Sequence, residues 1–438
     1  MSTVERKKVN GSCHCGFIKY TAVIKINPET GDIRPANRCN CSFCRKMSTT
    51  NHHLDGPQDF ELISPGSADE CGVHVWMHGY YEYEGTKHEL NVINLATIDQ
   101  PQEGVDLSKV KPTYSNMLVG QPGPPGDVPF EHGMTFPPGS PKLPIPASAR
   151  KRATVTERKV CDIYCYDIVA KSSFSNAIRN SDRRPKGPKR VYYFAGGGWR
   201  GPPSGEHWGL VVELAKRCPD TTVTLVSYPL APASPAPMAF PMLQKLYAAV
   251  LGESKRAGET VILAGDSAGG NIVLALALDA VIQQGEPSEK AHISLSEPLL
   301  PDAILAISPS TDLRRTNPDI SAIAPHDPIL RIPFIKETAA GWAGNWSTSD
   351  SRLSPLLAPD WAFTALADRG VQIHGLTGGY DILYPDAVLF REKCEKAGVQ
   401  GAWLHWERQM HVWPLTWKFY LPEAREAKQW MVGVLGRC

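Results

Sequence analysis

Short apolar runs alternate with longer amphipathic stretches along the C-terminal two thirds of the chain. The runs are typical of strands and occur at Val191–Phe194, Val223–Val226, Val261–Ala264, Ala303–Ile307 and Val371–Leu376. Helices are expected between them at Gly209–Lys216, Ala239–Ala257, Gly269–Gln284 and Asp386–Ala397. Strands that are apolar at every position need cover on both faces, so this alternation predicts an α/β fold around a parallel sheet.

The N-terminal part follows a different pattern. Residues 1–118 contain short runs that alternate in polarity, such as Phe17–Ile24, and they predict a small β-rich domain. Residues 119–149 are rich in proline and glycine, which neither a helix nor an inner strand tolerates, so we expect a linker there. The α/β domain then covers residues 150–438.

The composition indicates which kinds of molecule the protein is expected to bind. A chain of 438 residues is long enough for two or three domains, and its net charge of +1 gives no reason to expect nucleic acid or an anionic membrane. The charged start MSTVERKKVNGS lacks the apolar core of a signal peptide, and no apolar run reaches the ~18 residues of a membrane span. We therefore expect a cytoplasmic protein, with no membrane span, that acts on a small molecule.

The sharpest motif, GDSAGG, covers residues 265–270 and stands between a strand-like run and a helix-like run. A strand that turns directly into a helix passes through a strained corner, which small neighbours make sterically possible. Ser267 at the centre would be held clear of the sheet edge, above a helix N-terminus that favours developing negative charge. The motif predicts a nucleophilic serine.

A nucleophilic serine needs a base, and the base needs an acid that orients it. In this arrangement the order along the chain is serine, acid, histidine. Asp381 follows the strand-like run at Val371–Leu376, and His411 follows a further strand-like run, AWLHWER. His405 lies inside that run and His374 precedes the acid, so His411 is the better base.

The stabilising amides should come from the loop after Val191–Phe194. That loop holds three successive glycines, whose backbone N–H groups can approach a substrate oxygen without obstruction from side chains. Gly196, Gly197 and Ala268 are the predicted oxyanion donors.

These motifs together resemble the hormone-sensitive-lipase-like branch of the α/β-hydrolases. The matching segments are GGGW at 196–199, YPLAP at 228–232, GDSAGG at 265–270, Ser308-Pro309, DIL at 381–383 and HVWP at 411–414. The resemblance implies carboxylic ester hydrolysis without a cofactor, and a helical cap, which the insertion at residues 314–346 fits. One departure is Ala195, because the family has a histidine there that supports the oxyanion loop.

Cysteines cluster near the N-terminus. The spacings C-x-C and C-x-C-x-x-C suit thiolate ligation of zinc, and the chain has both in its first 71 residues. We predict a zinc site there, with free thiols as the alternative. The candidate ligands are Cys13, Cys15, Cys39, Cys41, Cys44 and Cys71.

This segment resembles the family of glutathione-dependent formaldehyde-activating enzymes and centromere protein V relatives, which have a β-rich zinc fold. The resemblance implies one zinc at Cys13, Cys15 and a later cysteine pair, and another at Cys39, Cys41 and Cys44. The later pair is reduced to Cys71, because Ala68 stands at its first position, unless Asp69, Glu70 or His74 substitutes. A structural zinc in a degenerate module is the expectation.

The sequence therefore predicts a serine esterase, either lipase-like or a deacetylase, with an accessory zinc domain. Two alternatives stay open. One is a zinc-dependent carbon–sulfur lyase that acts on glutathione adducts through the N-terminal domain. The other is a ligand-binding protein on a hydrolase scaffold that no longer catalyses a reaction.

Overall fold

The computed structural model divides the chain into two compact units. One comprises Met1–Met134 with Lys418–Pro422, and the other comprises Thr135–Trp417 with Glu423–Cys438. The structure describes residues 4–12, 19–27, 33, 36–39, 51–64, 76–83, 86–95, 98, 113–116, 121–123, 136–171, 187–285, 298–419 and 422–438.

The described part of the first unit is built from strands. A three-stranded antiparallel sheet joins β1 (Glu5–Ser12), β2 (Lys19–Ile26) and β5 (Phe60–Ser64). A six-stranded sheet has the order β6 (Trp76–Tyr83), β7 (Thr86–Asn94), β4 (Asn51–His53), β3 (Ala36–Cys39), β8 (Thr113–Asn116), β9 (Gln121–Gly123). A short 3₁₀ turn, Pro57–Asp59, precedes β5. Val9, Ile24 and Ile93 are buried in the core of this unit.

The predicted zinc ligands lie almost entirely outside the described residues. Cys39 ends β3, where only its backbone is described, and the other five candidates fall in undescribed segments. Among the residues that the structure describes, no group of three or more His, Cys, Asp or Glu side chains could hold a metal ion. The zinc site therefore stays a prediction.

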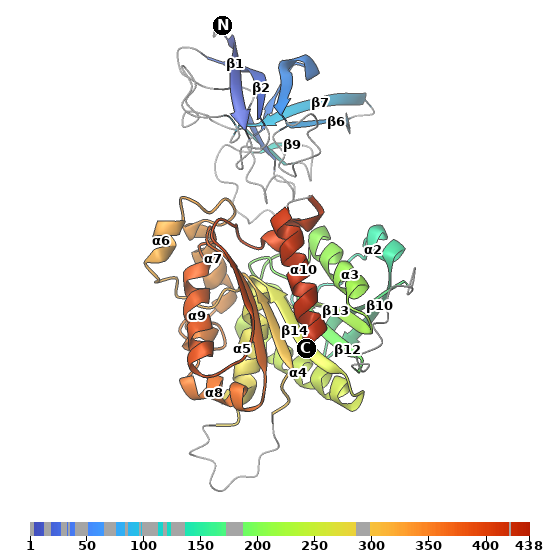
Figure 1. The fold of residues 1–438 in the computed structure, drawn as a ribbon, viewed down its shortest axis with the longest axis vertical. Coiled ribbons are helices and arrows are strands. Elements are labelled where there is room, and N and C mark those ends of the chain that lie inside the picture. The colour runs from blue at the N-terminus through green and yellow to red at the C-terminus, as the bar shows by residue number, and fades with distance from the viewer. Residues whose placement is uncertain are drawn as a thin grey trace. The chain divides into compact units, whose positions relative to one another are not determined.

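An eight-stranded sheet forms the centre of the second unit (Figure 1). Its order is β10 (Ala153–Val160), β11 (Ile163–Ala170), β13 (Thr221–Ser227), β12 (Lys189–Phe194), β14 (Thr260–Asp266), β15 (Ala303–Ile307), β16 (Gln372–Gly378), β17 (Trp403–Trp406). β11 pairs antiparallel with β10 and β13, and every later pairing is parallel.

Helices cover both faces of this sheet (Figure 1). α3 (Gly205–Arg217) packs on β11 and β13, and α10 (Pro422–Arg437) joins it through an ion pair between Lys428 and the buried Glu213. α4 (Ala236–Arg256), α5 (Ala268–Ile282), α8 (Asp360–Asp368) and α9 (Tyr384–Lys396) contact one another in succession, and α4, α5 and α9 also pack on strands of the sheet. The shorter elements are α2 (Ala147–Arg152), α6 (Asp319–Ile323), α7 (Ile332–Ala343) and the 3₁₀ turns Pro355–Leu357 and Trp413–Phe419.

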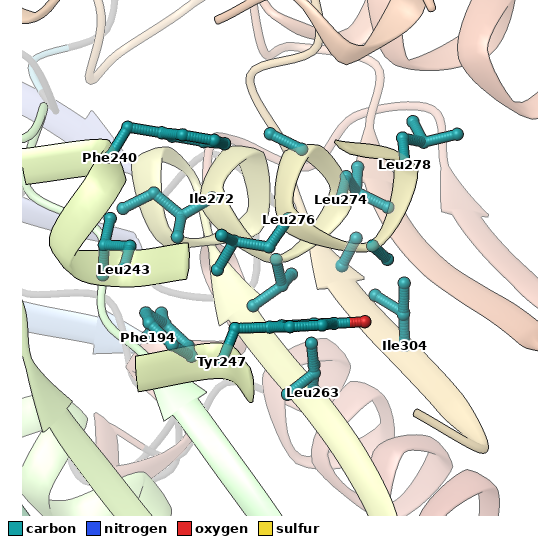
Figure 2. Close-up of a cluster of buried hydrophobic side chains, with 14 of the residues drawn as sticks. Phe194, Phe240, Leu243, Tyr247, Leu263, Ile272, Leu274, Leu276, Leu278 and Ile304 are labelled. Atoms are coloured by element: carbon teal, nitrogen blue, oxygen red, sulfur yellow. The ribbon is translucent and has the colours of Figure 1, made fainter. Parts of the chain in front are cut away.

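The main core lies between the sheet and helices α4 and α5 (Figure 2). Leu263 and Ile304 come from the strands, while Leu243, Ile272 and Leu276 come from the helices, and all are at most 2% exposed. Helix α5 is apolar nearly all round, and 13 of its 15 residues are buried. A helix held this firmly fixes the position of the residue that starts it.

The α/β prediction is confirmed, but the sheet is mixed rather than parallel throughout. β10 and β11 were not predicted, because their polar and apolar residues alternate near the sheet edge, as the burial of β10 shows. The predicted cap insertion at residues 314–346 contains α6 and α7. No described helix is long and apolar enough to cross a membrane.

Candidate active site

Ser267 stands at the corner between β14, which ends at Asp266, and α5, which begins at Ala268. Its backbone has φ 52° and ψ −116°, a strained conformation for a residue with a side chain. The corner is also crowded: a Cβ added at Gly269 would lie 1.9 Å from the carbonyl oxygen of Phe194. Glycine is therefore required beside the serine, as the motif predicted.

Ser267, His411 and Asp381, which are distant in the sequence, form one chain of hydrogen bonds. The Ser267 Oγ lies 2.9 Å from His411 Nε2, and His411 Nδ1 lies 2.7 Å from Asp381 Oδ2. His411 and Asp381 are 5% and 1% exposed, so this contact is shielded from water. Burial alone would lower the pKa of His411, but the charge of Asp381 and its hydrogen bond outweigh burial and raise this pKa.

The residues next to Asp381 and His411 are also held. The other oxygen of Asp381 accepts the N–H of Leu383 at 2.8 Å, which fixes the plane of the carboxylate. After His411, the Val412 N–H donates to Ser308 Oγ at 3.1 Å. The Ser308-Pro309 motif thus has a direct structural use, since it anchors the loop that carries the histidine.

The two rival histidines lie elsewhere. His405 is inside β17, stacks on Tyr384 at 4.5 Å between ring centroids, and has its Nδ1 3.2 Å from the Thr377 carbonyl oxygen. His374 is buried in β16, and burial lowers its pKa to about 4. In the structure it is His411, not either rival, that contacts Ser267.

The glycine loop lies directly beside the elbow. A Cβ added at Gly196 would lie 2.3 Å from Asp266 Oδ2 and 2.9 Å from the Cβ of Ser267, so only glycine fits there. Gly197 and Gly198 have φ of 133° and 61°, which glycine adopts without strain. The YPLAP segment holds the loop from behind: Tyr228 Oη donates to the Ala195 carbonyl at 2.8 Å.

A buried polar network around Asp266 was not predicted from the sequence. Asp266, 2% exposed, accepts from Tyr193 Oη at 2.7 Å, and its other oxygen lies 3.2 Å from His207 Nε2 on α3. Burial alone would raise the pKa of Asp266, but His207, Tyr193 and the backbone N–H of Gly196 outweigh burial and lower this pKa. The Gly196 amide thus contacts Asp266, which joins the loop to the elbow.

Residues of the cap segment also contact this loop. Trp199 stacks on Trp342 of α7 with ring centroids 5.9 Å apart and planes 10° apart. Arg200, next in the loop, forms an ion pair with Glu337 and donates to the Glu337 carbonyl at 3.2 Å. These contacts hold the end of the loop that follows the glycines, whereas Ala195 at its start is held by Tyr228.

A strained serine elbow within this sheet, with histidine and aspartate on later loops, defines an α/β-hydrolase. A family model described as the alpha/beta hydrolase fold matches residues 191–415, and the chain belongs to this family.

The chain is similar to an esterase of Acinetobacter venetianus, with 30% identity over 224 residues, which are 50% of this chain and 66% of that protein. It is 27% identical to human hormone-sensitive lipase over 199 residues, 43% of this chain and 17% of the lipase. The chain thus spans less than two thirds of the length of these relatives. Among solved structures, a hormone-sensitive lipase from a metagenome library has a similar fold, with a TM-score of 0.53 and 23% identity, covering 66% of this chain and 86% of that one.

A separate match concerns the other predicted resemblance. A protein of Halomonas elongata that carries the name glutathione-dependent formaldehyde-activating enzyme is 34% identical over 70 residues. The match covers 16% of this chain and 36% of that protein, which is too little to establish a family for the N-terminal unit.

Proposed function

We propose that this chain hydrolyses small carboxylic esters through an acyl-enzyme on Ser267. The observation that carries the proposal is the unbroken contact from Ser267 Oγ through the His411 ring to Asp381, at 2.9 Å and 2.7 Å. The similarity to the Acinetobacter venetianus esterase supports the same reaction class.

The contacts define a role for each side chain. Ser267 Oγ attacks the acyl carbon while its proton passes to His411 Nε2, and Asp381 holds Nδ1–H and stabilises the imidazolium. Collapse of the tetrahedral intermediate expels the alcohol, which takes the proton from Nε2. A water molecule then attacks the acyl-enzyme by the same route, releases the carboxylic acid and restores Ser267.

The negative oxygen of the intermediate needs donors that are already in place. Ala268 is the first residue of α5, so its N–H has no partner within the helix and lies at the positive end of the helix dipole. Gly197 supplies the opposing amide. Because the Gly196 N–H contacts Asp266, we assign Gly196 chiefly to holding the loop, with Gly197 and Ala268 as the donors.

Substitution of the nucleophile tests the proposal. Ser267→Ala should abolish hydrolysis of p-nitrophenyl acetate and butyrate, and also covalent labelling by a fluorophosphonate probe, because the attacking oxygen is gone. The matched control is Ser321→Ala, an exposed serine on α6. Unchanged hydrolysis in Ser267→Ala would refute the proposal.

We also propose that the cysteine cluster of the N-terminal unit binds zinc as a structural ion. Its support is the spacing of Cys13, Cys15, Cys39, Cys41 and Cys44 together with the Halomonas elongata match. Metal analysis of the purified protein tests this, and a zinc-free protein with reduced cysteines would contradict it.

A further inference from the structure

A second buried carboxylate, Asp327, lies beside the proposed catalytic acid. It is 2% exposed and belongs to the cap segment between α6 and α7, 54 residues before Asp381. No step of the ester hydrolysis described above uses it. Burying a carboxylate is costly unless hydrogen bonds compensate, so its contacts indicate its use.

Three backbone amides hold the Asp327 carboxylate. Oδ1 accepts from Ile329 and Leu330, both at 2.8 Å, which closes a tight turn within the cap segment. Oδ2 accepts from Ile382 at 2.9 Å, and Ile382 directly follows Asp381. The amide of the next residue, Leu383, goes to Asp381 itself. Two successive amides of one turn therefore donate to different carboxylates, the Ile382 N–H to Asp327 and the Leu383 N–H to Asp381.

The same cap segment contacts the acid turn on both sides of Asp381. His326 stacks on Tyr380 with ring centroids 5.1 Å apart and planes 17° apart. Leu330 shares a buried apolar cluster with Ile382 and Leu383. Residues 326–330 thus contact the turn both before and after Asp381, and the hydrogen bond from Ile382 to Asp327 lies between these contacts.

Asp327 contributes a negative charge near His411 in addition to its hydrogen bonds. Burial raises the pKa of Asp327, and the nearby charge of Asp381 raises it further. A turn of this kind can be capped by a neutral asparagine, which would avoid the like-charge contact. A second negative charge becomes favourable when His411 takes up a proton, because the charged groups that act on its ring are Asp381, Asp327 and Asp266.

We propose that Asp327 is a positioning residue that fixes the turn carrying Asp381, and so sets the orientation in which Asp381 meets His411. The proposal rests on the hydrolase function above. It makes the cap part of the acid–base side of the site: one backbone amide fixes the position of the acid turn, and the charge of Asp327 acts directly on His411.

Asp327→Asn in the full-length chain tests this role. The variant should lower kcat for p-nitrophenyl butyrate about tenfold and leave KM within about threefold, because the reacting groups and not the binding surface are displaced. The acid limb of the kcat/KM profile should move to lower pH, since a negative charge that raises the pKa of His411 has been removed. A purely structural role would not shift this limb.

Asp350→Asn is the matched control. Asp350 caps a similar turn, with Oδ1 accepting the Arg352 N–H at 2.9 Å, and it is not among the groups that act on His411. Its variant should keep wild-type kcat and the wild-type acid limb. Rates are expressed per site labelled by the fluorophosphonate probe, so that only folded protein is counted.

Two further variants separate the outcomes. Asp327→Glu keeps the charge but displaces it, so kcat should fall while the acid limb stays in place; if Asp327→Asn does not fold, this variant carries the test. In an Asp381→Asn background, Asp327→Asn should lower kcat by no more than about twofold, because its positioning effect on kcat acts through Asp381. The direct effect of its charge on His411 is measured by the acid limb of the single variant.

Wild-type kinetics in both Asp327 variants, or fully additive losses in the double variant, would overturn the inference. If Ser267→Ala also remained active, the hydrolase function itself would fail. If Ser267→Ala were inactive, only the role of Asp327 would be lost.

Discussion

The two sides of the candidate site are built from different parts of the chain. On the acid–base side, the proposed chemistry is carried by side chains, and Ser267, His411 and Asp381 meet through direct hydrogen bonds. On the oxyanion side, the proposed donors are backbone amides, and side chains such as Asp266 and Trp342 contact the loop that carries them. A substitution on the acid–base side therefore removes a reacting group, whereas a substitution on the oxyanion side displaces backbone amides that remain present.

The two sides also differ in how their buried carboxylates are stabilised in the low dielectric of the interior. On the acid–base side, Asp381 and Asp327 both act on the His411 ring, which would become positive in the proposed reaction. Beside the glycine loop, the buried Asp266 is in contact with Tyr193, His207 and the Gly196 amide. All three carboxylates accept hydrogen bonds in the structure, but in the proposed reaction Asp381 and Asp327 would gain further stabilisation when His411 becomes positive.

The largest effect on the oxyanion side should come from Gly196→Ala. The new methyl group would overlap Asp266 Oδ2, so the loop must move away from the elbow and carry its amides with it. We expect kcat for p-nitrophenyl butyrate to fall about 100-fold, the scale of losing one oxyanion donor. Gly205→Ala is the control, because a Cβ there meets nothing within 4 Å. Wild-type kcat in Gly196→Ala would remove the loop from the mechanism.

A smaller effect is expected for Asp266→Asn. Asparagine keeps one acceptor oxygen where aspartate has two, so either Tyr193 or His207 would face an NH₂ group that cannot accept a hydrogen bond. We therefore expect kcat to fall about tenfold and the free energy of unfolding to fall by about 1–3 kcal/mol. Asp279→Asn, a buried aspartate of α5 that accepts from Gln244, should change stability without this loss of kcat. Equal kcat losses in both variants would show that Asp266 supports the fold rather than the loop.

The smallest effect should come from zinc removal. Because no step of ester hydrolysis uses the cysteine cluster, a chelator that strips zinc should leave kcat/KM for p-nitrophenyl butyrate within about twofold. The measurement pairs metal content with initial rates before and after treatment. If hydrolysis were lost on chelation and restored by added zinc, the activity would depend on the metal, and the two units would not be functionally independent.

Regular structure was predictable where both faces of an element are buried. The run Ala303–Ile307 was predicted as a strand and is β15 with the same bounds, since all five residues are buried. β11 was missed, although its inner residues Ile163 and Ile168 are fully buried, because polar residues interrupt its pattern. The pattern of apolar residues reflects which positions are buried, so it predicts strands less clearly near the edge of a sheet.

The proposed catalytic side chains could be predicted because each follows a strand and has a recognisable neighbourhood. The supporting residues could not be found in the same way. Asp327 reaches the acid turn only after the cap has folded over it, and no spacing in the sequence relates the two. His207 left a weak signal, because it forms a capping box with Ser204 at the start of α3, but the sequence does not show that its other nitrogen faces Asp266.

The cap of this chain holds both sides of the site at once, with α7 against Trp199 and Arg200 and residues 326–330 against the acid turn. A lid that swung fully away to admit a bulky substrate would loosen the oxyanion loop and the acid in the same movement. Adaptation to larger esters is therefore expected to proceed by substitution of individual side chains of the cap, because displacement of the whole cap would lower turnover.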